Sequence, residues 1–270
     1  MQPDSRFLHQ PNDFWALTRY VSETVGYSER GRDRLKRYQP QDLQQFSDRF
    51  VIDPVVAPQV IDYLNFRSSF LEERVKPLLL DRSKAKETFE GLLKSCRPTC
   101  ALPMNKQKGE KRHYNYLICI VNILTEKHLK GKHFNDGPRS LCVVTDKANR
   151  PVKVCSRWMD GAYPNVLNPL AVWEVKEYYG TTTFGSRVAD GVYETQLDGY
   201  EILEAQKASD REIKHYLIVD DRFTWWDCGK SYLCRLVDMM HMGLVDEIVF
   251  GKEVLTRWPQ IVETWPEVTK

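Results

Sequence analysis

The chain has 270 residues, a formal net charge of +2, 42% hydrophobic residues and 28% charged residues. This length allows one large domain or two smaller ones with a substantial core, and the composition excludes a disordered chain. No apolar run approaches the ~18–20 residues that span a bilayer, and residues 1–6 lack the apolar segment of a secretory signal, so we expect a cytoplasmic protein without a membrane partner.

The first hundred residues contain short segments in which apolar residues recur at helical spacing. Neither an internal repeat nor a low-complexity tract interrupts them. The sequence therefore predicts a helical N-terminal lobe over residues 1–105, followed by a core over residues 106–270. The segments that carry the helical pattern in the lobe are 13–21, 40–46, 60–64, 70–75 and 84–93.

The pattern changes after residue 114, where a helix is followed by three strands and then by alternating helices and strands. The short connections 146–151 and 161–169 favour antiparallel neighbours, whereas the last two strands each follow a helix and favour parallel crossovers. We expect an α/β fold with a mixed central sheet flanked by helices on both faces. The predicted elements are helices 114–129, 186–206 and 231–242, and strands 141–145, 152–159, 170–178, 216–219 and 245–250.

Three charged residues stand out against these apolar strands. Asp160 directly follows the predicted strand 152–159, and Glu174 and Lys176 lie two positions apart in the predicted strand 170–178. Residues at i and i+2 of a strand project to the same face, and a charged pair on an apolar strand is costly unless it is paired or binds something. A salt pair on an exposed face is the simplest alternative. Two carboxylates with a lysine can also hold a hard divalent cation and activate water, which predicts a metal-dependent phosphodiesterase.

The order of helices and strands over about residues 110–255 resembles that of the core of the PD-(D/E)xK nuclease superfamily. This superfamily includes most type II restriction endonucleases. In that family an aspartate near the end of the second core strand pairs with a D/E-x-K triplet on the third, the positions of Asp160 and Glu174–Val175–Lys176. The resemblance implies a restriction-endonuclease-like fold. It also implies that Asp160, Glu174 and the Val175 carbonyl bind Mg²⁺, with Mn²⁺ as a substitute, and that Lys176 orients or deprotonates the attacking water.

The first acid of this set has two alternatives. The proline of the family normally stands directly before the aspartate, but Met159 does so here and Pro164 follows four residues after Asp160. Asn165 and Asp146 therefore remain alternative partners of the triplet. Asparagine is the weaker ligand and Asp146 falls in the preceding turn, so Asp160 is the preferred acid.

The residues after the triplet resemble the threonine-rich stretch of some restriction enzymes and predict contacts with DNA phosphates. On the next helix, the spacing of Gln196 and Tyr200 resembles a Gln-x-x-x-Tyr motif of exonuclease-type members of the superfamily. Glu194 and Gln196 are therefore candidate supporting residues of the site. The candidate DNA-binding residues are Thr181, Thr182, Thr183, Ser186 and Arg187.

Taken together, the resemblance implies a Mg²⁺-dependent endodeoxyribonuclease, a type II restriction enzyme that cleaves double-stranded DNA. Cleavage of both strands favours a homodimer. Basic clusters at residues 30–38, 106–114 and 127–133 suit phosphate contact, although solvated loops look alike. Neither a phosphate-binding G-x-x-x-x-G-K-[ST] loop nor a G-x-G-x-x-G motif is present, so no nucleotide cofactor is expected. The alternatives are a repair or exonuclease-type member and a non-catalytic nucleic-acid-binding or interaction protein on the same fold.

Overall fold

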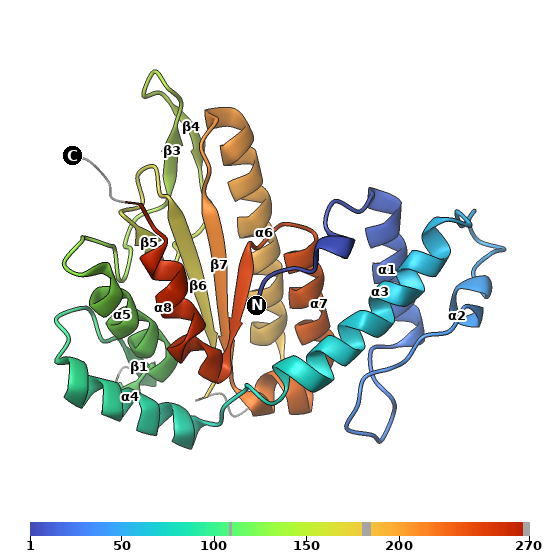
Figure 1. The fold of residues 1–270 in the computed structure, drawn as a ribbon, viewed down its shortest axis with the longest axis horizontal. Coiled ribbons are helices and arrows are strands. Elements are labelled where there is room, and N and C mark those ends of the chain that lie inside the picture. The colour runs from blue at the N-terminus through green and yellow to red at the C-terminus, as the bar shows by residue number, and fades with distance from the viewer. Residues whose placement is uncertain (108–109, 180–184, 267–270) are drawn as a thin grey trace.

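A four-stranded mixed sheet lies at the centre of the computed structural model, which describes residues 1–107, 110–179 and 185–266 (Figure 1). The spatial order of the strands is β5-β6-β7-β8. β5 and β6 are antiparallel neighbours. β7 runs parallel to β6 and β8 runs parallel to β7, and each of these last two strands is reached through a helix. The expected mixed α/β sheet is confirmed. The strands are β5 (Gly161–Tyr163), β6 (Ala171–Glu177), β7 (Lys214–Asp220) and β8 (Glu247–Phe250).

Helices cover both faces of this sheet because the side chains of each strand alternate between two apolar layers (Figure 1). Trp173 and Val175 of β6 pack in the same cluster as α5 and α8, whereas Val172 packs against α6. β7 and β8 also contribute to the layer that contains α7. None of the described helices is long and apolar enough to cross a membrane. The covering helices are α5 (Tyr116–Leu129), α6 (Ser186–Ser209), α7 (Lys230–His241) and α8 (Arg257–Glu263).

Two of the expected core strands lie outside the central sheet. β3 (Val143–Thr145) and β4 (Pro151–Val154) form a separate antiparallel pair, so the expectation that they join the central sheet is wrong. The predicted strand 152–159 also ends early, at Val154. The reason is a side chain of α6, because Glu201 accepts hydrogen bonds from the backbone N–H and the hydroxyl of Ser156 at 2.8 and 2.7 Å.

The connection expected over residues 161–169 contains a strand of its own, β5. Its Gly161 lies against the indole of Trp173, and a Cβ atom at Gly161 would come within 2.0 Å of that ring. Glycine here reflects close packing in a sheet and not a turn. A second hairpin, β1 (Met104–Gln107) with β2 (Glu110–Tyr114), was not anticipated from the sequence.

The N-terminal region is helical, as the sequence predicts, but its last helix belongs to the sheet side of the molecule. α4 packs against α5, and its Ala85 and Phe89 share the apolar cluster of α5 and α8. The preceding helices pack among themselves and against α7. The remaining helical segments are η1 (Ser5–Phe7), α1 (Asn12–Val25), α2 (Gln41–Gln44), α3 (Val56–Phe70), η2 (Leu71–Val75), α4 (Arg82–Cys96), η3 (Phe223–Cys228) and η4 (Gly251–Leu255).

A buried ion pair joins the N-terminal helices to the sheet layer. Nη1 of Arg67 on α3 donates to both carboxylate oxygens of Asp238 on α7 at 2.9 and 2.8 Å. The hydroxyl of Tyr63 donates to the same carboxylate at 2.7 Å, and Ser22 accepts from the second Nη atom of Arg67. Arg67 is fully buried. Removing one partner would leave a buried charge without compensation.

We expect Arg67→Met to lower the free energy of unfolding by about 3–5 kcal/mol, because Asp238 would keep its charge but lose its cation. Urea denaturation followed by circular dichroism measures this loss. Arg150→Met is the matched control, since its pair with Asp146 lies on the surface and contributes at most about 1 kcal/mol. Equal effects of the two substitutions would show that the Arg67–Asp238 pair does not anchor the N-terminal helices.

Candidate active site

A polar cleft of about 460 Å³ opens where β5 begins beside β6. Residues that the sequence predicts as one catalytic set share its lining. Side chains from β6, from the turn before β5 and from α6 contribute to it. The residues relevant to the chemistry are Asp160, Glu174, Val175, Lys176, Arg187 and Glu194.

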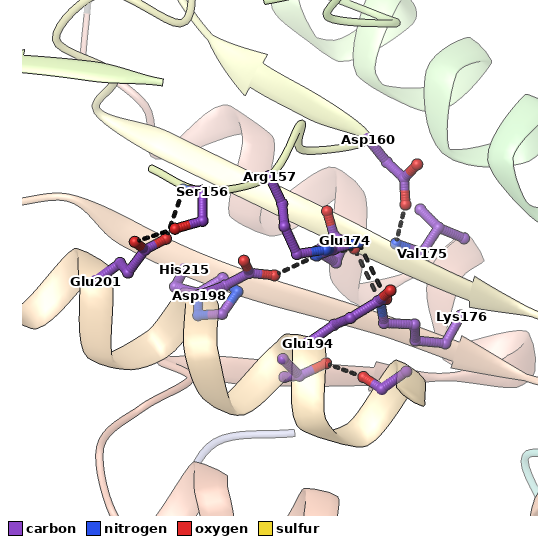
Figure 2. Close-up of polar contacts among 12 residues, drawn as sticks. Ser156, Arg157, Asp160, Glu174, Val175, Lys176, Glu194, Asp198, Glu201 and His215 are labelled. Atoms are coloured by element: carbon purple, nitrogen blue, oxygen red, sulfur yellow. Dashed lines mark hydrogen bonds and ion pairs between the residues drawn. The ribbon is translucent and has the colours of Figure 1, made fainter. Parts of the chain in front are cut away.

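Asp160 lies at the edge of β6, directly beside the backbone of Val175. Gly161 pairs with Trp173 across the antiparallel strands, which places Asp160 opposite Glu174. The N–H of Asp160 donates to the Trp173 carbonyl at 3.1 Å. Its carboxylate accepts the N–H of Val175 at 2.7 Å (Figure 2). In an extended strand the N–H and C=O of one residue point to the same side. The Val175 carbonyl is therefore directed to the edge where Asp160 lies.

The environment of Asp160 makes its charge unfavourable. Burial raises the pKa of this carboxyl group to about 7, and the negative charge of Glu174 acts in the same direction. The hydrogen bond from Val175 and the charges of Lys176 and Arg157 oppose the shift. A bound cation would stabilise the ionised carboxylate of Asp160. Asp160 is therefore well placed to act as a ligand of a cation.

Glu174 and Lys176 project from β6 toward α6 and are almost completely buried, with 2% and 5% of their surface exposed. Nζ of Lys176 lies 2.9 Å from Oε2 of Glu174 and 3.2 Å from Oε2 of Glu194 on α6. Burial on its own would lower the pKa of Lys176, but the charge and hydrogen bond of Glu174 outweigh it and raise the pKa above its ordinary value. Lys176 is therefore a protonated ammonium at neutral pH.

Two further residues complete the ionic cluster, and the sequence analysis did not single them out. Arg157, in the turn before β5, lies between Glu174 and the α6 residues Glu194 and Asp198 (Figure 2). Asp198 is completely buried, and burial together with the charge of Glu174 raises its pKa to about 7. Its position four residues after Glu194 is the one sequence signal that marks it, because residues i and i+4 share a helix face.

The donor atoms in this cleft suit a hard divalent cation. Oε1 of Glu174 is buried and has no hydrogen-bond partner within the described part of the chain, and a buried oxygen of this kind is costly if left alone. No three His, Cys, Asp or Glu side chains of the described residues are grouped so that they could hold a metal ion by themselves. Mg²⁺ does not require such a group, because it is usually bound through one or two carboxylates and keeps several waters. Asp160, Glu174 and the Val175 carbonyl therefore fit Mg²⁺.

The two alternative acids lie elsewhere. Asp146 accepts the backbone N–H groups of Ala148 and Arg150 in the turn between β3 and β4. Asn165 accepts a hydrogen bond from Asn135 and lies in an exposed position after β5. Neither lines the cleft, whereas Asp160 does.

The remaining predicted residues divide between the cleft and other surfaces. Ser186 and Arg187 begin α6 in exposed positions, and Arg187 lines the cleft. Glu194 also lies in it, but Gln196 lines a different groove with Arg235 of α7. From the β1–β2 hairpin, Asn105 and His113 are paired across the strands and line the cleft. His113 belongs to the basic cluster 106–114, whereas Asn105 was not among the predicted residues. The candidates Thr181, Thr182 and Thr183 lie outside the described residues.

Comparison with known proteins gives two family matches. The family model "Domain of unknown function (DUF7687)" matches residues 80–265, and "Domain of unknown function (DUF7690)" matches residues 1–74. The first match contains the whole central sheet and the cleft, and it begins just before α4. No curated protein and no solved structure matches the chain.

Because its pKa is raised on folding, Asp198 should make the metal-free protein less stable as the pH rises. The folded state binds this proton more tightly than the unfolded state between the unfolded pKa of about 3.9 and the folded pKa of about 7. The stabilising contribution is complete below about pH 4 and is lost as the pH rises through about 7. Asp198→Asn cannot titrate, so its free energy of unfolding should fall less steeply over this range. Urea denaturation in EDTA between pH 4.5 and 8 tests this, and parallel curves for both proteins would contradict it.

Proposed function

The chain belongs to the DUF7687 family, and we propose that it is a Mg²⁺-dependent endodeoxyribonuclease that hydrolyses double-stranded DNA. The observation that carries the proposal is the composition of one cleft. Asp160, Glu174, Val175 and Lys176 come from two neighbouring strand ends and line the same polar cavity. Sequence spacing alone placed Glu174 and Lys176 on one face, but it did not bring Asp160 to them.

The arrangement around β6 supports a restriction-endonuclease-like core. An aspartate at the start of one strand lies opposite the triplet on its antiparallel neighbour, and a helix then leads to a parallel strand. The antiparallel neighbour and the parallel crossover match the PD-(D/E)xK resemblance, but Asp160 precedes the short strand β5 and does not lie near the end of the strand before it, β4. β3 and β4 differ from the expected core, because they pair with each other and not with the four-stranded sheet. A type II restriction enzyme, acting as a homodimer on both DNA strands, is the form of the activity that we propose.

The charges of the site also favour one divalent cation. Among the described residues, Lys176 and Arg157 lie beside the four carboxylates of Asp160, Glu174, Glu194 and Asp198. With all six side chains ionised, this group carries a formal charge of −2. Mg²⁺ held by Asp160, Glu174 and the Val175 carbonyl would balance it. When bound, Mg²⁺ would polarise the scissile phosphate and acidify the attacking water.

In this mechanism Lys176 orients the water and does not deprotonate it. A protonated ammonium donates hydrogen bonds but cannot accept a proton. Glu174 and Glu194 hold Nζ of Lys176 between β6 and α6, which fixes the direction of its third N–H. In the hydrolysis the water oxygen bonds to phosphorus and the P–O3′ bond breaks. The products are a 5′-phosphate and a 3′-hydroxyl, whose proton derives from water.

The direct test is incubation of the purified protein with supercoiled plasmid and Mg²⁺, with an EDTA control and with Glu174→Gln. The wild-type protein should cut and the variant should lose cleavage by several orders of magnitude. DNA binding by the variant should be equal or tighter, since a negative charge is removed. Discrete fragments indicate a site-specific enzyme and a smear indicates a non-specific nuclease. If the wild-type protein is correctly folded and the plasmid stays intact, the proposal is contradicted and a non-catalytic DNA-binding protein is favoured.

Lys176→Met tests the mechanism separately, because the thioether side chain keeps much of the packing and removes the charge. We expect the single-turnover cleavage rate to fall about 10²–10⁴-fold, the range of a positioned proton-transfer or water-orienting group. The rate at saturating DNA and Mg²⁺ is the quantity to measure. A variant that cuts at the wild-type rate would make Lys176 a structural partner of Glu174.

A further inference from the structure

The two closest contacts of Arg157 in the cleft are with residues of α6 that are not among the proposed Mg²⁺ ligands. Its Nη1 donates to Asp198 at 2.7 Å and its Nη2 lies 3.0 Å from Glu194. Asp198 has no exposed surface, so the inner end of this pair is fixed by packing as well as by charge. Two carboxylates one helical turn apart thus orient the planar guanidinium.

The contact between Arg157 and Glu174 is the longest of the three, at 3.5 Å. Oε2 of Glu174 already has a closer cation, Lys176 at 2.9 Å. Loss of the Glu174 contact would therefore leave Arg157 in place. This distinguishes Arg157 from Lys176, whose closest carboxylate is Glu174 itself.

The guanidinium also retains unused donors, and Arg157 borders the cleft. Arg157 lines the cavity and keeps 26% of its side chain exposed, while its partner Glu174 is buried. A guanidinium has five N–H donors, and within the described part of the chain its Nε makes no hydrogen bond. Arginine with free, pre-oriented donors is suited to bidentate recognition of a phosphate.

We propose that Arg157 is a further catalytic residue, whose guanidinium binds a non-bridging oxygen of the scissile phosphate. The inference rests on the proposed nuclease function and deepens it. A phosphodiester beside Glu174 comes within reach of Arg157, since the two side chains are 3.5 Å apart. Negative charge on the phosphate oxygens increases in the transition state, and a fixed cation there stabilises it more than the ground state.

The experiment compares Arg157→Met, Arg157→Lys and the double variant Arg157→Met/Asp198→Asn with the wild-type protein. The single-turnover rate of plasmid cleavage is measured at saturating DNA and Mg²⁺, and Mn²⁺ binding without DNA is measured by calorimetry. We expect Arg157→Met to cut about 10²–10³-fold more slowly. We also expect Mn²⁺ to bind as tightly as in the wild type or more tightly, because a cation next to the carboxylates is removed. Arg150→Met, on the surface, should match the wild type.

The other variants separate phosphate binding from charge balance. Arg157→Lys keeps the charge but not the planar fork, so its rate should stay at least 10-fold below that of the wild type. The double variant replaces the buried ion pair by neutral groups, and it keeps the test valid if Arg157→Met fails to fold. A wild-type rate in Arg157→Lys or in the double variant would overturn the proposal. Wild-type protein that binds no Mn²⁺ and leaves DNA intact would instead overturn the proposed function itself, and this role of Arg157 with it.

Discussion

The buried ion pair of Glu174 and Lys176 is the interaction on which the rest of the site depends. Both side chains leave an otherwise apolar strand and are taken out of water, which is unfavourable unless each charge has a partner. Neighbouring elements supply those partners: Glu194 of α6 pairs with Lys176, and Arg157 in the turn before β5 pairs with Glu174. Arg157 is in turn paired with Asp198 of α6. The cluster nevertheless keeps an excess of negative charge and a buried Glu174 oxygen without a partner. This imbalance is what makes a structural salt bridge an incomplete explanation.

The central sheet determines where Asp160 lies relative to the Glu174–Lys176 pair. β5 is only three residues long, and its first residue, Gly161, pairs with Trp173. The chain before it is turned away from the ladder, because the backbone of Ser156 is bound by Glu201 of α6. Asp160 therefore occupies the edge of β6 with its side chain on the backbone of Val175. One short strand thus exposes a backbone carbonyl beside two carboxylates.

The sequence was sufficient for the parts of the structure that follow from local periodicity. Alternation of apolar and charged residues placed Glu174 and Lys176 on one face of β6, and the order of helices and strands predicted a mixed sheet. β5 was missed because Gly161 and Pro164 are typical of a turn, whereas Gly161 is required by the packing of Trp173. Only the three-dimensional structure shows how close that indole lies.

The helix that completes the site was predicted, but its orientation was only partly deduced. Glu194 and Gln196 are two residues apart and so face different sides of α6, and only Glu194 reaches the cleft. The partner on the correct face is Asp198, at i+4 from Glu194. Arg157 and Asp198 are 41 residues apart in the chain, and nothing in local spacing connects them. Contacts of this kind depend on how α6 packs on the sheet, which the sequence pattern does not specify.

The most direct test of the account is to locate Mn²⁺ in crystals of the protein by anomalous scattering. We predict one peak in the cleft, roughly 2.0–2.5 Å from oxygens of Asp160, Glu174 and the Val175 carbonyl, as for oxygen ligands of hard cations. The same crystals of Glu174→Gln should show a weaker peak or none. A cleft without a peak at saturating Mn²⁺, or Mn²⁺ bound only at other carboxylates, would contradict a metal-dependent active site on β6.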